Sequence, residues 1–350
     1  MSVVESVRNV LWARRRQPDQ LVYGVALAHE RFGPDELLEQ AVEAERAGFD
    51  VVCCSDHLAP WWEPGHPAPA HCANPWVWLG AAGQLTSSVS LGPAVTALTH
   101  RYNPVVVAQQ IATLELMNPG RAFLAVGSGE AMNEVPAGLD WPSPEEQLAR
   151  TEEALTIVTR LLEGRTVDFD GRWFHARGAR LYAVPDRSPP VFMSAFGEQA
   201  AEIAGRLADG VWTLADPRSV PEVVSSYRRS SERAGREPGE IVLQGMFAWD
   251  ESDDAALESA REWKPILVKE NYSEDIHEPG RIQANGREAV SDLTFKTMGL
   301  FSADPQDHVR KIKALRQFGP TAIVLMNVSG NNPVAALRTY GESVLPRLRE

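Results

Sequence analysis

Short runs of β-branched and other apolar residues alternate with amphipathic helical stretches along almost the whole chain. Eight of these runs predict strands, at residues 21–27, 51–55, 89–95, 122–127, 191–195, 210–214, 241–249 and 322–328. The stretches that follow them predict eight helices, at residues 35–47, 76–85, 103–117, 144–163, 198–207, 220–234, 305–318 and 333–348. A regular alternation of strand and helix is typical of a parallel sheet whose strands are joined by crossover helices.

Eight such units in 350 residues predict an α/β fold of the (β/α)8 TIM-barrel type, which usually has roughly 250 residues and accepts insertions. Residues 166–184 indicate an inserted strand pair with an Asp-Gly turn, and residues 264–300 a long irregular insertion. No linker rich in Pro, Gly and Ser divides the chain, so we expect one barrel domain over residues 21–350, preceded by an N-terminal extension at residues 1–20. A doubly wound sheet is the alternative fold, but no Gly-x-Gly-x-x-Gly turn follows the first predicted strand.

The balance of charges excludes several classes of partner. The chain has 34 Lys and Arg against 47 Asp and Glu, a formal net charge of −13, and no basic cluster that would follow a nucleic-acid backbone. No apolar run approaches the roughly 20 residues that cross a bilayer, and the N-terminal Arg cluster follows the apolar residues, the reverse of a signal peptide. The cysteines and histidines form no disulfide framework or metal-ligand motif. We expect a cytoplasmic protein with no nucleic-acid, membrane or metal partner.

In a barrel of this type, the chemistry is found where the strands end and the following loops begin. The second predicted strand ends in Ser55-Asp56-His57, and its imidazole can take up a proton near neutral pH. Trp61 follows and would form an apolar wall beside it. The alternative is that His57 is a structural hydrogen-bonding residue.

The fourth predicted strand ends in Gly127-Ser128-Gly129-Glu130, and Asn133 follows one turn later. Glycines let a ligand approach the backbone, a carboxyl group in such a place can have a raised pKa, and an Asn amide can bond the edge of a planar ring. The alternative is a tight turn with a helix-capping glutamate.

Five long motifs occur in an order and at spacings that resemble the deazaflavin-dependent glucose-6-phosphate dehydrogenases of the bacterial luciferase-like superfamily. They are SDHLAPW, LGPAVTALTHRYNPVVVAQQIATL, RAFLAVGSGEAMNE, VDFDGRWFHARGARLYAVP and AGRLADG. The similarity covers nearly the whole chain from about residue 21 onward. It implies a TIM barrel, usually dimeric, that binds coenzyme F420 and a small-molecule substrate at its C-terminal mouth.

The resemblance also implies roles for single residues. His57 would remove the substrate's hydroxyl proton while a hydride leaves the same carbon for the deazaflavin ring. Glu130 would supply a proton or a hydrogen bond to that ring, and Trp61 would line the reaction centre. Asp56 would contact the cofactor, and Asn133 would hold the edge of the ring. A base for the alcohol and an acid for the ring can serve both ends of one hydride transfer.

Other cofactor contacts are implied along the neighbouring strands. Family members have a non-prolyl cis peptide in the third strand, which falls at Ala94-Val95, and a threonine near the ring, which falls at Ala97 with Thr96 beside it. The residues Gly127-Ser128-Gly129 would face the cofactor through their backbone. After the fifth strand, Ala195-Phe196-Gly197 would hold the cofactor's phosphate, although the family has two glycines where this chain has Phe196-Gly197.

The family's clamp for the sugar phosphate is missing from this chain. The positions that hold a threonine, two lysines and an arginine in the family are here Leu214, Pro217, Ser273 and Thr297 or Met298. A buried phosphate dianion without cationic partners is strongly disfavoured, so the sequence favours a less anionic alcohol, hemiacetal or carbonyl substrate. The alternative is that Arg218, Lys269 or Lys296 restores phosphate binding from a shifted loop.

Bulky side chains replace the missing charges. We expect the substrate pocket to be lined by Trp62, Leu214, Ser273 and Met298. Other tryptophans that fall near predicted strand ends or in long loops are Trp76, Trp78, Trp212 and Trp249. An acidic protein that binds an anionic cofactor also needs a local basic rim, for which the candidates are His100, Arg101, Arg121 and the basic residues of the 264–296 insertion.

Two other functions remain open. A monooxygenase of the same superfamily would use FMN and oxygen, and would not need His57, Trp61 and Glu130 together. A barrel that only sequesters a ligand would have no activity to lose when His57 is replaced.

Overall fold

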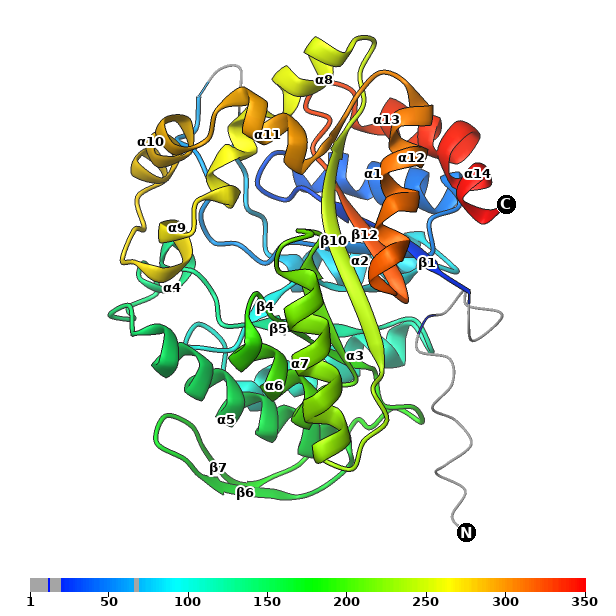
Figure 1. Cartoon of the computed structure of the whole chain (residues 1–350). Coiled ribbons are helices and arrows are strands. Elements are labelled where there is room, and N and C mark those ends of the chain that lie inside the picture. Colours follow the sequence, from blue (N-terminus) through cyan, green and yellow to red (C-terminus); the bar gives the residue numbers. More distant parts are fainter. Residues whose placement is uncertain (1–11, 13–19, 66–68) are drawn as a thin grey trace.

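The structure is a computed structural model that describes Trp12 and residues 20–65 and 69–350. Nine parallel strands curl into a barrel in the order β3-β2-β1-β12-β10-β9-β8-β5-β4 (Figure 1). They are β1 (Val22–Leu27), β2 (Val51–Cys54), β3 (Ser90–Pro93), β4 (Thr96–Ala97), β5 (Leu124–Gly127), β8 (Val191–Ser194), β9 (Gly210–Leu214), β10 (Glu240–Ala248) and β12 (Ala322–Asn327). A tenth strand, β11 (Leu300–Phe301), pairs with the end of β10. The predicted TIM-barrel fold is confirmed.

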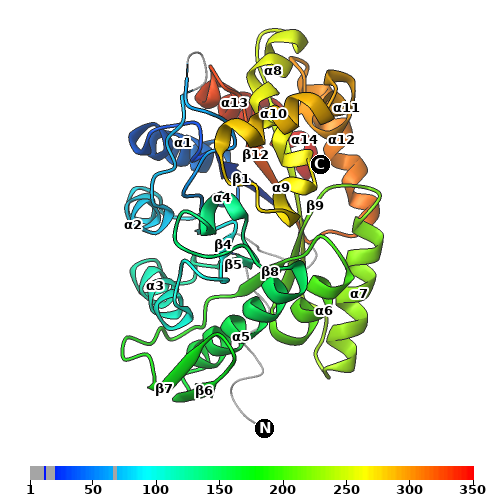
Figure 2. The same ribbon diagram turned by 90° about the vertical axis from the view of Figure 1, so that its left-hand side faces the viewer.

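Helices surround the strands on the outside (Figures 1 and 2). The helices of the repeat are α1 (Pro34–Ala47), α2 (Pro75–Leu85), α3 (Pro104–Met117), α5 (Pro144–Leu162), α6 (Glu198–Leu207), α7 (Val220–Arg233), α12 (Pro305–Leu315) and α13 (Pro333–Thr339). A π-helical turn at Tyr340–Val344 connects α13 to α14 (Leu345–Arg349). Local signals set the ends of these helices. The Asn103 side chain accepts a hydrogen bond from the Val105 N–H at the start of α3, and α1 ends at Gly48 with a φ of 94°.

The third strand of the barrel is interrupted. The sequence predicts one strand at residues 89–95, but the structure has β3 paired with β2 and β4 paired with β5. Between them lies the cis peptide bond Ala94-Val95, at the position that the family resemblance implied. The barrel therefore closes through one broken strand, and β4 carries Thr96 and Ala97 toward the mouth.

The two insertions differ in how well they follow the sequence prediction. Residues 166–184 form the expected antiparallel pair, β6 (Val167–Asp170) and β7 (His175–Ala179), outside the barrel. The insertion at 264–300 is not irregular. It contains a 3-10 turn (Arg261–Leu267), α9 (Glu270–Ser273), α10 (Pro279–Ala289) and α11 (Asp292–Met298), and it follows an unpredicted helix, α8 (Asp253–Ala260). Within this insertion, α9 and α11 have only four and seven residues, too few for a clear hydrophobic period.

The N-terminal ends of the strands are closed by aromatic rings. Phe123, just before β5, and Phe192, at the start of β8, lie in the fully buried core. Trp12 is also fully buried, with its ring stacked on Phe192 at 5.0 Å between ring centroids and edge-on to Phe123 at 5.4 Å. Except for Trp12 and Gln20, the predicted extension at 1–20 lies outside the described residues. Over the part of the chain that the structure describes, no helix combines the length and apolar character that crossing a membrane requires.

Candidate active site

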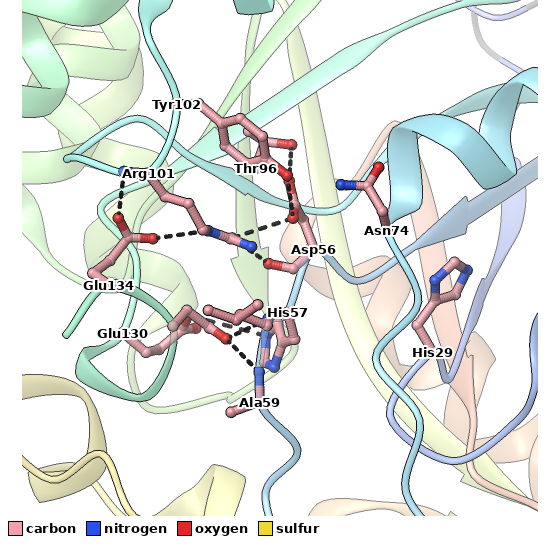
Figure 3. Close-up of polar contacts among 12 residues, drawn as sticks. His29, Asp56, His57, Ala59, Asn74, Thr96, Arg101, Tyr102, Glu130 and Glu134 are labelled. Atoms are coloured by element: carbon pink, nitrogen blue, oxygen red, sulfur yellow. Dashed lines mark hydrogen bonds and ion pairs between the residues drawn. The ribbon is translucent and has the colours of Figure 1, made fainter. Parts of the chain in front are cut away.

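His57 lies between two carboxyl groups, those of Glu30 and Glu130, at the C-terminal mouth of the barrel, and Figure 3 shows it beside Glu130. It follows β2 by three residues, and its side chain is 11% exposed. Its Nε2 lies 4.0 Å from Glu130 Oε2, and its Nδ1 lies 3.3 Å from Glu30 Oε1, at an angle too poor for a hydrogen bond. The structure thus brings together the predicted base and acid, with a second carboxyl group behind the imidazole.

Glu30 was not among the residues predicted from the sequence. It follows β1 by three residues and is almost fully buried, and the Ser55 hydroxyl donates a hydrogen bond of 2.8 Å to its Oε2. A carboxylate held in this way can orient an imidazole and stabilise its protonated form. The signal that could have found Glu30 is its position, because it ends the first strand as His57 ends the second.

Burial shifts the pKa values of this pair in opposite directions. Burial lowers the pKa of His57 below its usual 6.5, although the nearby Glu30 charge raises it in part. Burial raises the pKa of Glu130 above its usual 4.5, against the effect of a hydrogen bond from Asn133. Both shifts favour the uncharged form, so His57 loses its proton more readily and Glu130 keeps its proton to a higher pH than in water, as suits a base and an acid in one reaction.

Asn133 connects the loops that carry His57 and Glu130. Its Oδ1 accepts hydrogen bonds from the backbone N–H groups of Leu58, at 2.7 Å, and Ala59, at 3.2 Å. Its Nδ2 donates to Glu130 Oε2 at 3.0 Å. The helix α4 (Ala131–Glu134) presents Asn133 for these bonds. The predicted contact of Asn133 with a ring stays a prediction, and the structure adds the role of holding the two loops at a set separation.

Asp56 is buried and its carboxylate is fully engaged (Figure 3). It accepts hydrogen bonds from the Thr96 hydroxyl at 2.7 Å and the Tyr102 hydroxyl at 3.1 Å, and Arg101 lies 3.2 Å away. Arg101 also pairs with Glu134 at 3.3 Å. This network joins the loops after β2, β4 and β5, so it builds the floor on which any ligand at the mouth would rest.

The predicted basic rim is wrong for two of its members. The Arg101 guanidinium forms ion pairs with Asp56 and Glu134, and only 12% of its side chain is exposed. Arg121 precedes β5, at the other end of the barrel, and binds the carbonyl oxygens of Val89 and Thr86. Both side chains are paired with polar groups inside the protein, because buried backbone carbonyls and carboxylates need hydrogen-bond partners.

The glycines after β5 have a packing reason of their own. A Cβ atom at Gly127 would lie 2.7 Å from Val95 Cγ2, and one at Gly129 would lie 3.0 Å from the Ala97 Cβ. Gly129 also has a φ of 82°, in the left-handed region. Between them, Ser128 uses its carbonyl oxygen to accept a hydrogen bond from the Thr99 hydroxyl. The broken third strand therefore requires these glycines, whatever ligand approaches them.

The segment after β8 leads into the N-terminus of α6. Ala195 is buried, Phe196 is half exposed, and Gly197 is the N-cap residue. No side chain among the described residues caps the first turn of α6, and a Cβ atom at Gly197 would meet nothing within 4 Å. The open N–H groups of this ten-residue helix could hold an anionic group.

Two of the tryptophans expected near the mouth, Trp62 and Trp212, are buried in the core. Trp62 is fully buried against Trp263, with ring centroids 5.0 Å apart, and Trp212 packs against Phe123 inside the core. Trp61 does lie beside His57, at 5.4 Å between ring centroids. Large aromatic side chains are most often core residues, and alternation along a strand alone cannot separate the barrel interior from its mouth.

The other residues that the sequence placed in the substrate pocket or near a phosphate are partly exposed, paired with carboxylates, or exposed. Leu214, at the end of β9, Ser273, in α9, and Met298, at the end of α11, are each partly exposed. Arg218 is exposed and pairs with Asp216 through two nitrogen atoms. Cations of the insertion that pair with carboxylates are Arg261, Lys264 and Arg287. Lys269 and Lys296 are exposed. In the described part of the chain, no three His, Cys, Asp or Glu side chains group in a way that could hold a metal ion.

Comparisons with known proteins agree with this architecture. A family model described as "Luciferase-like monooxygenase" matches residues 10–322. The chain is 36% identical to an F420-dependent glucose-6-phosphate dehydrogenase of Microbacterium testaceum, over 94% of this chain and 98% of that protein. A protein of the same name from Nakamurella multipartita is also 36% identical, over 95% of this chain and 98% of the relative.

Solved structures show the same relationship. An F420-dependent secondary alcohol dehydrogenase in complex with an F420-acetone adduct superposes with a TM-score of 0.88, at 32% identity, over 95% of this chain and all of the other. The coenzyme F420-dependent tetrahydromethanopterin reductase of Methanopyrus kandleri shares the fold, with a TM-score of 0.75 at 21% identity over 94% of this chain and 99% of that one. The chain therefore belongs to the luciferase-like monooxygenase family, in which it resembles the F420-dependent glucose-6-phosphate dehydrogenases.

Proposed function

We propose that this protein is a coenzyme F420-dependent oxidoreductase that transfers a hydride between a CH–OH carbon and the deazaflavin. The observation that carries the proposal is the adjacent pair His57 and Glu130, whose pKa values are shifted in opposite directions by burial. Oxidation of an alcohol requires a base at the hydroxyl group, and reduction of the deazaflavin requires a proton donor at the ring. The names of the relatives support the same class of reaction.

His57 acts as the base through its Nε2 atom. Nε2 is the nitrogen that faces Glu130, whereas Nδ1 faces Glu30 on the other side of the ring. Once Nε2 has accepted the hydroxyl proton, the Glu30 carboxylate stabilises the imidazolium, because it already raises the pKa of His57 against burial. Glu30 is therefore a positioning residue for the base.

Glu130 acts as the proton donor. Its raised pKa favours the protonated carboxyl group, and the bond from Asn133 keeps one of its oxygens in place. Because Asn133 also binds the backbone after His57, it holds the acid and the base at a fixed separation. A fixed geometry of this kind lowers the entropic cost of the reaction.

The residues of the mouth fit a deazaflavin with a phosphate-bearing tail. When bound, the cofactor supplies the carbon that exchanges the hydride. Asp56, Thr96, the Ala94-Val95 bulge and the Gly127-Ser128-Gly129 backbone would hold its ring, together with Asn133. Ala195-Phe196-Gly197 and the uncapped N-terminus of α6 would hold a phosphate, because their N–H groups are open.

We infer a substrate that is less anionic than a sugar phosphate. The proposed pocket residues Leu214, Ser273 and Met298 are uncharged, and Arg218 is neutralised by Asp216. These uncharged side chains would not compensate a phosphate dianion for its lost hydration. A secondary alcohol, a hemiacetal or the corresponding carbonyl compound suits this site. The solved relative that carries an F420-acetone adduct is consistent with such a substrate.

A cofactor titration followed by a turnover assay tests the proposal. We expect tight F420 binding, followed by quenching of tryptophan fluorescence, and reduction of F420 by simple alcohols. His57→Ala should lower the turnover by about 10²–10⁴-fold. His175→Ala is the matched control, because this exposed histidine lies on the β7 hairpin and pairs with Asp170 there.

The other outcomes identify the alternative functions. Tight FMN binding without F420 binding would point to a monooxygenase of this family. Ligand binding without turnover, indifferent to His57→Ala, would point to a barrel that only sequesters its ligand. The cytoplasmic location and the homodimer expected from the sequence belong to the same proposal.

A further inference from the structure

The insertion between β10 and β11 brings an aromatic side chain to the edge of the proposed active site. Tyr272, in α9, has its ring 5.6 Å from the ring of Trp61 and 6.0 Å from the ring of Phe196, measured between centroids. Both views of the molecule place α9 opposite α4, the helix that begins directly after Glu130 (Figures 1 and 2). Three aromatic side chains from three separate loops thus form a continuous row beside His57. We name Trp61, Tyr272 and Phe196 the aromatic wall.

The polar end of Tyr272 is turned away from this row. Its hydroxyl donates a hydrogen bond of 2.9 Å to the backbone carbonyl of Ile266, within the insertion itself. The ring is therefore anchored at its far end, and the hydroxyl is not available to hydrogen-bond a substrate in this arrangement. What Tyr272 contributes to the aromatic wall is apolar ring surface.

The position of α9 is fixed by buried polar contacts. Asn271 is fully buried, and its Nδ2 donates to the Pro265 carbonyl at 2.9 Å, while its Oδ1 accepts from Asn285 at 3.0 Å. The helix α10 packs tightly on the same segment, since a Cβ atom at Gly286 would lie 2.6 Å from Pro265. Satisfied buried polar groups make a segment rigid. The insertion therefore holds the Tyr272 ring in a fixed position at the edge of the proposed active site.

The charged groups around the aromatic wall are a carboxyl group, several paired cations and the exposed Lys269 at the start of α9. Glu130 lies close enough that its charge helps raise the pKa of Tyr272, after the larger effect of burial. The paired cations of the insertion face carboxylates: Arg261 and Lys264 pair with Asp292, and Arg287 pairs with Glu262. An anionic substrate would meet aromatic carbon and a carboxyl group, which do not compensate for its lost hydration.

We propose that Tyr272 is a specificity-determining residue that closes the substrate side of the mouth and limits it to compact, uncharged alcohols and their carbonyl counterparts. This inference rests on the proposed oxidoreductase function and adds the group that selects its substrate. Trp61 and Phe196 complete the aromatic wall. A bulkier substrate is excluded by the Tyr272 ring, and the aromatic carbon of the wall itself offers a phosphorylated one no ion pair.

The test compares substrates of increasing size in the full-length protein loaded with F420. We propose 2-propanol, cyclopentanol and cyclooctanol as the series, and glucose 6-phosphate as the anionic probe. Tyr272→Ala should raise the kcat/KM of cyclooctanol relative to that of 2-propanol on the order of tenfold, because removing the ring opens space that the larger alcohol fills. Most of the change should appear in KM. Tyr272→Phe keeps the ring and should keep the wild-type preference.

Two further variants make the result independent of the folding of Tyr272→Ala. Phe196→Ala changes a half-exposed member of the aromatic wall and should shift the preference in the same direction. Tyr182→Ala is the control, since this tyrosine is 83% exposed and lies beyond the β7 hairpin. The affinity for F420 should stay within about twofold of the wild type in Tyr272→Ala and Tyr182→Ala, because neither residue belongs to the segments that would hold the cofactor.

A binding measurement separates the two proposals. Calorimetric titration with the matching ketones reports the size preference without any turnover. If wild-type protein turns over none of the alcohols but Tyr272→Ala still improves the binding of the largest ketone, the proposed function fails and the aromatic wall stands. If the size preference is the same in wild type, Tyr272→Ala and Phe196→Ala, both in turnover and in binding, Tyr272 is not a specificity determinant. Efficient use of glucose 6-phosphate by the wild type would also overturn the inference.

Discussion

The charged and titratable residues at the mouth lie next to one another, and each one affects the chemistry of its neighbour. His57 lies between Glu30 and Glu130, and Asp56 is held by Arg101. Burial would make an isolated charge at any of these positions costly, so each charged group has a partner. The chemistry of the site follows from these partners as much as from the side chains themselves.

At this scale the pH dependence of activity is a direct test. Alcohol oxidation needs neutral His57, so kcat/KM should fall on acidification only below pH 6.5, because burial lowers the pKa of His57 below that value. It also needs protonated Glu130, so activity should fall as the pH rises through the raised pKa of Glu130. Glu130→Gln should remove this alkaline decline, since an amide does not titrate, and should lower kcat by about 10²–10⁴-fold.

The measurement is kcat/KM against pH at constant ionic strength. Glu134→Gln is the matched control, because burial also raises the pKa of Glu134 but this group faces Arg101. Glu134→Gln should keep the alkaline decline. An alkaline decline that persists in Glu130→Gln would show that Glu130 is not the proton donor.

At the scale of helices and strands, the broken third strand and the helical insertion determine what reaches the mouth. The break between β3 and β4 lets Thr96 bind Asp56, and it places Val95 against Gly127. The insertion brings Tyr272 to Trp61 across the opening. Both features depart from the regular strand–helix repeat, so the repeat alone would not bring Thr96, Val95 or Tyr272 to the mouth.

The contact of Trp12 with the barrel predicts that the N-terminal segment contributes to stability. Trp12 is fully buried and stacks on Phe192, so Trp12→Ala should lower the free energy of unfolding by about 3–5 kcal/mol. Urea unfolding followed by circular dichroism measures this change. Leu293→Ala, at a side chain that is 77% exposed, should change the stability by no more than about 0.5 kcal/mol. Equal unfolding midpoints for Trp12→Ala and wild type would mean that the N-terminal segment does not stabilise the barrel.

At the scale of the whole molecule, the helices α2 and α3 are neighbours on the outside of the barrel (Figure 2). Large side chains exposed on them are Val77, Leu85, Val106, Leu116 and Met117. Contiguous exposed apolar surface on a soluble protein marks an interaction site. With a net charge of −13, a second copy would be repelled over most of its surface, so an apolar face is where two copies can meet.

We therefore expect a homodimer that forms through α2 and α3. Light scattering on the purified protein should give twice the chain mass, and Met117→Glu combined with Val77→Glu should shift the protein toward the monomer, because two buried charges would lack partners. Leu293→Glu, on the distant helix α11, should leave the dimer intact. A wild-type protein that is monomeric at micromolar concentration would contradict this expectation.

The sequence by itself determined the barrel and the start of helices such as α3, because hydrophobic periodicity and caps such as Asn103 are local signals. It also made His57 and Glu130 candidates, through their positions at strand ends and through the family resemblance. Glu30 shows the limit of that reading, because its role depends on Ser55 and His57, which lie on the next strand.

Only the tertiary structure decided which charges were free and which aromatic rings reached the mouth. Arg101 is a cation in the sequence, but the fold pairs it with the carboxylates of Asp56 and Glu134 from two other loops. Trp62 and Trp212 entered the core, whereas Tyr272, in an insertion with no clear period, came to lie beside Trp61. The physical reason is that burial and pairing are properties of contacts between distant segments, and a linear pattern of side chains does not specify these contacts.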